Sequence, residues 1–319
     1  MEKLKQQFLE VSDALELGNP AIIEKDYWVV ALLSELAEVK PDSHQMVFSG
    51  GTALAKSNVK ILRMSEDVDI KLIPKQAFDK LSRAKKKAVR KACINGIEHA
   101  ITRSERFTVE ARSVRDEYRY VELELRYPQQ FSQAPCLRPI IKLELMETIP
   151  LFDAEPRSIQ SLVAELYKQP PEVKAFDCVS IHATLVEKII SMLRRTMSVK
   201  RDAQRKDDAT LVRHIYDVYC ILKTEEQTEH LDLTALTALF KTVLEEDIVR
   251  FGNQHAEFVA TPKQELQLGL KELEENPVFR QRFVDFVTPM VFNPQHHDFD
   301  TCFASFKRVA HQLLSSIDE

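Results

Sequence analysis

The sequence has only six glycines in 319 residues, five cysteines, one tryptophan and no apolar run of about 18 residues. Without such a run, no helix is expected to span a membrane. The cysteines are odd in number, widely separated and never arranged as Cys-x-x-Cys, which argues against a disulfide framework or a zinc site. The first residues lack the apolar segment of a signal peptide. We therefore expect a cytoplasmic protein, without a membrane partner, whose cysteines are buried thiols.

The composition that is present is that of a globular protein, with 44% hydrophobic and 29% charged residues and a net charge of −5. Charge is distributed unevenly. Between Lys75 and Lys91 there are eight basic residues and one acid, and between Arg194 and Lys206 six basic residues and one acid. A mildly acidic protein can still present a local positive surface to a polyanion, so both segments are candidates for contact with RNA phosphates.

The pattern of apolar residues changes along the chain. The first forty residues have helical spacing, with Pro20 placed to begin a second helix, and a long basic helix is expected from Pro74 to about Arg103. Short apolar or alternating segments predict strands at residues 46–48, 68–73, 107–112, 118–126 and 139–146. After Pro170-Pro171 we find only helical periodicity, at residues 183–197, 210–222, 231–244, 279–287 and 304–317. The sequence thus predicts an α+β domain at 1–155, with a mixed sheet and flanking helices, followed by a helical domain at 156–319.

Two short motifs carry possible chemistry. Gly50 and Gly51 stand between a predicted strand and a predicted helix, where glycine lets the backbone turn sharply and approach a phosphate. Asp67 and Asp69 are two residues apart on the next predicted strand, so their carboxylates face the same side. Hard carboxylates near a phosphate site suit Mg²⁺. Glu144, on a neighbouring predicted strand, is the candidate for a third acid of a two-metal site.

The order Gly-Gly, short helix and Asp-x-Asp resembles the minimal nucleotidyltransferase fold of the polymerase-beta-like superfamily. More closely, the sequence resembles the AbiEii/AbiGii family of nucleotidyltransferase toxins from abortive-infection and toxin–antitoxin systems. The resemblance covers about residues 24–222. It rests on Glu24-Lys25-Asp26-Tyr27-Trp28-Val29, Phe48-Ser49-Gly50-Gly51-Thr52-Ala53-Leu54, Arg63-Met64-Ser65-Glu66-Asp67-Val68-Asp69-Ile70, Ala183-Thr184-Leu185-Val186-Glu187-Lys188 and Arg213-His214-Ile215-Tyr216-Asp217-Val218-Tyr219. The chain departs from the family pattern in a charged insertion, residues 194–208, between its lysine and aspartate motifs.

The resemblance implies a role for each matching residue. Asp67 and Asp69 are expected to hold the metal ions, Lys188 to neutralise phosphate charge, and Asp217 to support the site from the helical domain; these four form the predicted catalytic set. The predicted nucleotide-binding residues are Gly50, Gly51, Thr52, Lys56 and Ser65.

The implied activity is Mg²⁺- or Mn²⁺-dependent transfer of a nucleotide from an NTP to an acceptor, with release of pyrophosphate. The favoured acceptor is RNA, at the 3′ end of tRNA, and the expected outcome is growth inhibition or abortion of phage infection. An antitoxin is the expected operon partner, and a direct complex with it is not required. Two other activities stay open, nucleotidylation of a protein and binding of GTP without transfer. The sequence does not select the base, the acceptor or the oligomeric state.

Overall fold

The computed structural model describes residues 2–59, 61–132, 137–149, 154–228, 232–291 and 297–317. The chain forms two compact units, one made of Met1–Asn58 and Met64–Ser180 and the other of Val59–Arg63 and Ile181–Glu319. The change of unit therefore falls at residue 180, whereas the sequence predicted a boundary at 155. Residues 154–180 belong to the first unit because they contribute two strands to its sheet. Across the described ranges, no helix is long and apolar enough to cross a membrane.

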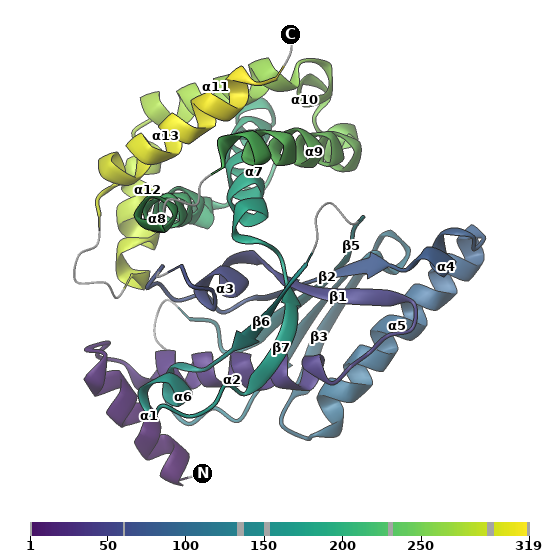
Figure 1. Cartoon of the computed structure of the whole chain (residues 1–319), viewed down its shortest axis with the longest axis vertical. Helices are drawn as coiled ribbons and strands as arrows, with labels where there is room; N and C mark the ends of the chain where they lie inside the picture. The colour runs from purple at the N-terminus through teal and green to yellow at the C-terminus, as the bar shows by residue number, and fades with distance from the viewer. Residues whose placement is uncertain are drawn as a thin grey trace. The chain divides into compact units, whose positions relative to one another are not determined.

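A mixed sheet of seven strands organises the first unit, and the predicted α+β class is confirmed (Figure 1). The strands are β1 (His44–Ser49), β2 (Val68–Pro74), β3 (Thr108–Arg115), β4 (Tyr120–Arg126), β5 (Ile141–Glu147), β6 (Glu155–Ile159) and β7 (Val173–Cys178). Their order is β3-β4-β5-β2-β1-β7-β6, with parallel pairing between β2 and β5 and between β1 and β7. The five predicted strands are present. The prediction that strands end before Pro170 was wrong, because β7 follows those prolines.

Several helices of the first unit begin at residues that favour a helix start. They are α1 (Glu2–Ala14), α2 (Pro20–Ala37), α3 (Gly50–Ala55), α4 (Gln76–Asp79), α5 (Arg83–Arg103), the 3-10 turn η1 (Asp116–Tyr118) and α6 (Leu162–Leu166). Pro20 does begin α2, and the side chain of Asn19 accepts a hydrogen bond from the amide of Ala21. The single basic helix expected after Pro74 is instead α4 and α5, which are separated where Ser82 caps α5.

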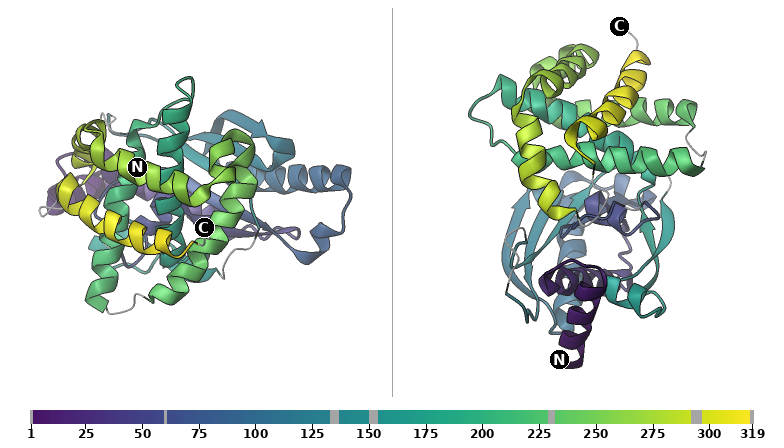
Figure 2. Two further views of the ribbon diagram at one scale, coloured as in Figure 1. Left: turned by 90° about the horizontal axis from the view of Figure 1, so that it is seen from above. Right: turned by 90° about the vertical axis from the view of Figure 1, so that its left-hand side faces the viewer.

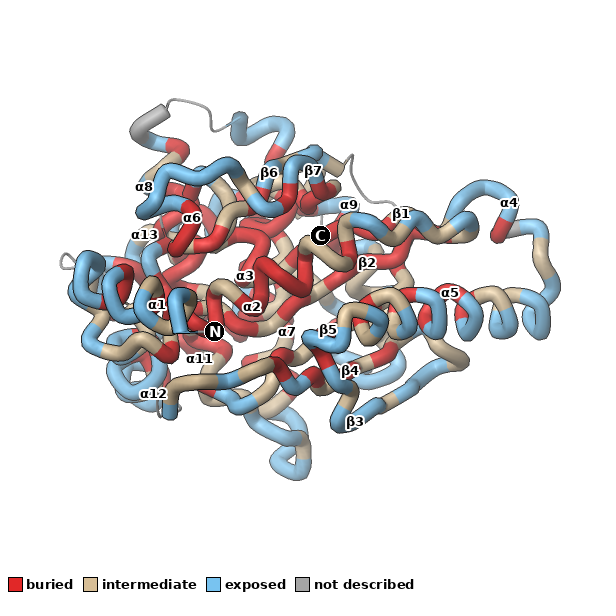
Figure 3. The backbone as a smooth tube through the Cα atoms, turned by 90° about the horizontal axis from the view of Figure 1, so that it is seen from below, coloured by how far each residue is buried: buried red, intermediate tan, exposed pale blue. Residues whose placement is uncertain are grey.

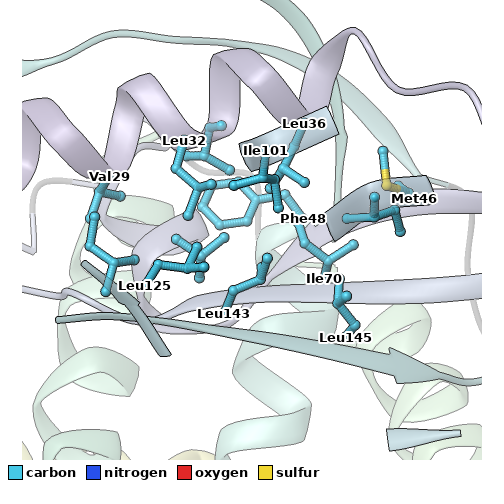
Figure 4. Close-up of a cluster of buried hydrophobic side chains, with 14 of the residues drawn as sticks. Val29, Leu32, Leu36, Met46, Phe48, Ile70, Ile101, Leu125, Leu143 and Leu145 are labelled. Carbon is cyan, nitrogen blue, oxygen red and sulfur yellow. The ribbon is translucent and has the colours of Figure 1, made fainter. Parts of the chain in front are cut away.

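The core of the first unit lies between the sheet and the helices α2 and α5. Figure 4 shows Leu32 and Leu36 of α2 and Ile101 of α5 facing the sheet residues Phe48 and Leu143, all of them buried. Alternate residues of β2, β4 and β5 enter this core, so the residues between them lie on the opposite face of the sheet. Figure 3 shows α2 largely buried, whereas α5 alternates between buried and exposed turns. Asp69 of β2, Glu122 of β4 and Glu144 of β5 are therefore on the face opposite this core, whereas Glu147 at the end of β5 pairs with Arg90 of α5.

The described residues of the second unit form helices and their connections, with one isolated bridge between Arg63 and Val291. Its elements are α7 (Ile181–Arg201), η2 (Ala209–Val212), α8 (Arg213–Thr228), α9 (Leu233–Phe251), η3 (Gly252–Gln254), α10 (Ala256–Ala260), α11 (Pro262–Glu275), α12 (Val278–Phe286), η4 (Thr288–Met290) and α13 (Phe299–Ser315). Helix α7 packs against α8, α9 and α11, and α13 packs against α8 and α11 (Figure 2). The five predicted helices are present, whereas α10 and α11 were not predicted. Cys93, Cys178, Cys220 and Cys302 are buried free thiols as expected, whereas Cys136 lies outside the described residues.

One helix contact in the second unit depends on glycine. A Cβ atom at Gly269 of α11 would lie 2.6 Å from the carbonyl oxygen of Leu193 in α7. Because the obstructing atom is backbone, the two helices would have to move apart to accept a side chain. At Gly96 in α5, by contrast, a Cβ atom would meet nothing within 4 Å.

We therefore expect Gly269→Ala to lower the free energy of unfolding by about 1–3 kcal/mol through overpacking. The matched control, Gly96→Ala, should instead raise it by about 0.5–1 kcal/mol, since alanine favours a helix. Urea denaturation followed by circular dichroism measures both variants. Equal effects of the same sign would show that the contact between α7 and α11 is not close.

Candidate active site

The turn between β1 and α3 brings backbone against a carboxylate. Gly50 has φ +78°, a left-handed conformation that favours glycine, and a Cβ atom there would lie 1.9 Å from Oδ2 of Asp69. Gly51 follows as the second residue of α3. The two predicted motifs, Gly-Gly and Asp-x-Asp, therefore meet in the first unit, and the absence of a side chain at Gly50 leaves room for the Asp69 carboxylate.

Hydroxyl groups of the turn hold the backbone of the acidic strand. Ser49 donates a hydrogen bond to the carbonyl of Asp69 over 3.1 Å. The Thr52 hydroxyl donates to the carbonyl of Asp67, and its oxygen lies 3.0 Å from the hydroxyl of Ser65, within hydrogen-bond distance. Only 1% of Thr52 is exposed. The side chains of Thr52 and Ser65, predicted to contact nucleotide, are thus engaged in fixing the segment that carries Asp67.

Acidic side chains form a row across three strands. Asp69 of β2 is the register partner of Glu144 in β5, which in turn is opposite Glu122 of β4. Partners in register project from the same face of a sheet, so these carboxylates are neighbours there. Lys142 forms ion pairs with Glu144 and, over 3.1 Å, with Glu122. Glu144 therefore lies beside Asp69, as predicted, but its charge is already balanced by a lysine.

Lys142 also shifts the pKa of one acid in this row, Glu122. Burial would raise the pKa of Glu122, but hydrogen bonds from Lys142 and Tyr120 outweigh burial and lower it. Burial alone would lower the pKa of Lys142, and its two acidic partners raise it instead. Burial and the nearby carboxylates raise the pKa of the Tyr120 hydroxyl, which stays protonated and donates to Glu122 over 3.0 Å. The charged forms of Glu122 and Lys142 therefore stabilise each other.

Arg138, which the sequence analysis missed, lies beside Asp67. Its Nη1 donates to Oδ1 of Asp67 over 2.6 Å, and its backbone amide donates to Glu66 over 3.0 Å. Lys25 of α2 is fully buried and donates to the carbonyls of Arg138, over 2.8 Å, and of Ile140. The loop before β5 is thereby attached to the residue that precedes Asp67.

A buried ion pair supports that attachment. Lys25 Nζ lies 3.3 Å from Glu66 Oε2. Burial lowers the pKa of Lys25 and raises that of Glu66, and their mutual attraction only partly opposes burial. Because each charge would be costly to leave alone in this environment, the pair fixes α2 to the segment that carries Asp67.

Lys56 does not extend toward solvent. Its ammonium pairs with Asp26 of α2 and donates to the carbonyl of Gln160 over 3.0 Å. The other oxygen of Asp26 accepts the amide of Leu162, at the start of α6, over 2.7 Å. Lys56 was predicted to bind nucleotide, but its observed contacts connect α3 to α2 and α6. A residue within a loop-to-helix motif can serve packing as well as ligand binding, and spacing alone does not distinguish the two.

In the second unit, Asp217 of α8 is wholly buried between two cations. Arg63 donates to its two oxygens over 2.6 and 2.7 Å, and Lys188 of α7 lies 2.8 Å from Oδ2. Burial would raise the pKa of Asp217, but the charges and hydrogen bonds of Arg63 and Lys188 hold it well below its usual value. The predicted pair Lys188 and Asp217 is thus brought together, with Arg63 as a third member that was not assigned a role.

Four residues that contact the predicted site residues were not assigned a role from the sequence, and they differ in whether the sequence could have identified them. Arg63, Lys25 and Asp26 all stand inside the segments that resemble the toxin family, so their presence there was a usable signal. Arg138 belongs to no such segment, and it reaches Asp67 only because the sheet places β5 next to β2. Among the residues with a described position, no three histidine, cysteine or acidic side chains are grouped so as to hold a metal ion. Of the three predicted metal ligands, Glu144 is paired with Lys142, so we base the candidate metal site on Asp67 and Asp69.

A cavity at the other end of β1 involves none of these residues. It has a volume of about 260 Å³ and is lined by residues of α2, β1 and β7, including His44, Gln45 and Asp177. His44 and Gly50 lie at opposite ends of β1 and its following turn. We therefore place the candidate site at the Gly50 end of the strand.

The contacts of Asp217 predict a large cost for removing its charge. Asp217→Asn leaves two buried cations without their counter-charge, and we expect the free energy of unfolding to fall by about 3–5 kcal/mol at neutral pH. Because the pKa of Asp217 is depressed, this stabilisation is present above its ordinary value of 3.8 and is lost as the pH falls below it. The difference between variant and wild type should therefore shrink in acid.

Denaturation in urea at neutral and acidic pH measures this difference. Asp300→Asn is the matched control, because Asp300 pairs with Arg280 at the surface and should contribute less than about 1 kcal/mol. A cost for Asp217→Asn no larger than for the control would contradict the buried ion-pair assignment.

Comparison with known proteins concerns the fold and the family. The structure resembles that of MenT4, a nucleotidyltransferase toxin from Mycobacterium tuberculosis H37Rv, with a TM-score of 0.53 and 15% identity over 98% of this chain and 90% of that one. At this identity the likeness concerns the fold. A search of curated proteins gave no match. The family described as nucleotidyl transferase AbiEii toxin, type IV toxin–antitoxin system, matches residues 31–305. The chain therefore belongs to the AbiEii family of nucleotidyltransferase toxins.

Proposed function

We propose that this nucleotidyltransferase transfers a nucleotide from an NTP to an RNA acceptor, with a divalent cation held by Asp67 and Asp69. The observation that carries the proposal is the meeting of the Gly-Gly turn with the acidic strand, where Gly50 leaves the space that Asp69 Oδ2 occupies. Mg²⁺ in nucleotide sites is commonly bound through one or two carboxylates and the substrate phosphates. The two aspartates fit that requirement without a third protein ligand.

The reaction replaces one bond to phosphorus with another. The oxygen of the acceptor hydroxyl bonds to the α-phosphorus and its proton is released to solvent, while the bond from that phosphorus to the bridging oxygen of the β-phosphate breaks and pyrophosphate leaves. When bound, a divalent cation supplies charge neutralisation of the phosphates and of the leaving pyrophosphate. The protein's part is to hold the two aspartates in place, through Thr52 and Ser49 on their backbone carbonyls.

Lys188 and Asp217 keep the functions that the family resemblance assigns, with one refinement. Because Asp217 is buried and both its oxygens are used by Arg63, it suits orienting Lys188 better than binding a ligand. Lys188 is 7% exposed and would supply a positive charge to phosphate. We treat Asp217 as a positioning residue.

The acceptor is inferred from charge. Helix α5 and the segment before it present exposed lysines, and α5 has no acidic residue in its first turn. The exposed lysines are Lys75, Lys80, Lys85, Lys87 and Lys91. They lie in the same unit as Asp67. This supports RNA as acceptor, with tRNA 3′ ends as the first substrate to test, and growth inhibition or abortive infection as the consequence.

The second basic segment has a different use. Arg194 pairs with Asp247, Arg195 with Asp208, and Arg201 with the buried Glu265. Lys200 pairs with Glu272 and Arg205 donates to the carbonyl of Gln254. Residues 194–201 are the last turns of α7, and their basic side chains bind neighbouring elements of the second unit. We therefore do not include residues 194–206 in the proposed RNA surface.

The activity test is incubation of the protein with each α-labelled NTP, Mg²⁺ and either total tRNA or a protein extract. We expect label on RNA and release of pyrophosphate, and Asp67→Asn or Asp69→Asn should reduce incorporation by about a hundredfold or more while leaving the melting temperature within a few degrees. Glu155→Gln, an exposed acid of β6, is the control with the same change of charge.

Label on protein alone would identify protein nucleotidylation instead of RNA modification. Tight nucleotide binding without pyrophosphate release from any NTP would indicate a GTP-binding module. Wild-type incorporation by both aspartate variants would contradict the metal role.

The RNA surface has its own test. Replacing Lys85, Lys87 and Lys91 by glutamine should weaken tRNA binding and make its affinity less dependent on salt, with the slope reduced by roughly 0.7–0.9 for each phosphate that is no longer neutralised. The control replaces three other exposed lysines, Lys168, Lys174 and Lys206, for the same change in net charge. Fluorescence anisotropy at several salt concentrations measures both. Equal weakening in the two variants would show an effect of net charge alone.

A further inference from the structure

Arg138 combines a fixed backbone with an exposed head group. Its amide donates to Glu66 and its carbonyl accepts from the buried ammonium of Lys25, so both sides of its peptide backbone are held. Its side chain, in contrast, is 47% exposed and ends on Asp67, which is 25% exposed. The guanidinium can therefore leave Asp67 without disturbing the loop that carries it.

The atom that Arg138 contacts is one that the proposed cation requires. Nη1 of Arg138 donates to Oδ1 of Asp67 over 2.6 Å, the geometry of a strong charge-assisted hydrogen bond. The Glu66 carboxylate lies within 4.0 Å of Nε of the same guanidinium. Arg138 thus neutralises the acidic group at this point, and the guanidinium and a divalent cation cannot both bind the same carboxylate oxygen at full strength.

We propose that Arg138 is a built-in counter-ion of the site, which holds Asp67 in the protein without metal and leaves Oδ1 when a divalent cation binds. The inference rests on the proposed role of Asp67 as a metal ligand. Binding of the cation is then an exchange of one positive charge for another. The affinity for the cation is reduced by the fraction of molecules in which Arg138 still occupies Asp67.

A consequence is that removal of the Arg138 side chain strengthens metal binding. Arg138→Gln keeps the backbone contacts with Lys25 and Glu66, so the variant should fold. We expect its dissociation constant for Mn²⁺, added alone, to fall by about three- to tenfold relative to wild type, because competition for Oδ1 is gone. Titration with Mn²⁺ followed by electron paramagnetic resonance measures binding directly, without turnover.

The control for net charge is Arg126→Gln. Arg126 is a more exposed arginine of β4 that forms an ion pair with Glu110, and its replacement changes the charge of the first unit by the same amount. We expect its Mn²⁺ affinity to stay within twofold of wild type. A gain in Arg138→Gln equal to that in Arg126→Gln would overturn the proposal, as would unchanged or weaker Mn²⁺ binding in Arg138→Gln.

Asp67→Asn separates this inference from the proposed function. If Asp67→Asn loses Mn²⁺ binding and Arg138→Gln is unchanged, the metal site holds and the counter-ion proposal fails. If Asp67→Asn binds Mn²⁺ as tightly as wild type, the assignment of Asp67 as a ligand fails, and both conclusions fall together. Loss in Asp67→Asn with a gain in Arg138→Gln supports both.

Discussion

The first unit depends on three consecutive charged residues of α2, which are buried and bind loops that connect other elements. Glu24, Lys25 and Asp26 are at most 8% exposed, and each must therefore be paired within the protein. Glu24 accepts the amides of Gln130 and Phe131, over 2.7 and 3.1 Å. Lys25 and Asp26 hold the loop before β5 and the end of α3. One helical turn thus holds the connection between β4 and β5 at two points and also holds the end of α3.

The acidic residues of the site also need partners of opposite charge within the protein. Carboxylates in register on adjacent strands repel one another, and a sheet that carries them needs cations nearby. Lys142 serves Glu122 and Glu144, and Arg138 serves Asp67. In the second unit, Arg63 and Lys188 do the same for Asp217. These acids therefore have basic partners within the chain before any ligand binds.

Sequence alone predicted the fold class because apolar residues recur at every second position in strands such as β2 and β5. Val68, Ile70 and Leu72 of β2 enter the core, which is the period that a half-buried strand requires. Strand β7 has two adjacent exposed residues, Lys174 and Ala175, that interrupt this period, and β6 contains Pro156. Both strands lie at one side of the sheet, where pairing with a neighbour outweighs a weak local pattern. Helix α11 was not predicted, and one of its acidic residues, Glu265, is buried against Arg201 and His255.

The site could be predicted as a set of motifs but not as a set of contacts. The approach of Gly50 to Asp69 follows from a strand, a tight turn and a paired strand, all of which are local signals. The contacts of Lys56 and Arg138 depend on which elements become neighbours, over separations of 30 and 71 residues. No periodicity encodes such a choice. Long-range pairing therefore accounts for most of what the sequence left open.

The chain passes between its two units three times, because residues 59–63 belong with the helices while their neighbours on both sides belong with the sheet. Tyr216 donates to the carbonyl of Ile61 over 2.9 Å, and Asp217 pairs with Arg63, so this short segment is built into the helical core. Cutting the gene at residue 180 would therefore not yield two self-sufficient halves. The amino-terminal fragment would carry a guanidinium deprived of its acid, and the carboxyl-terminal fragment would be left with a vacancy in its interior.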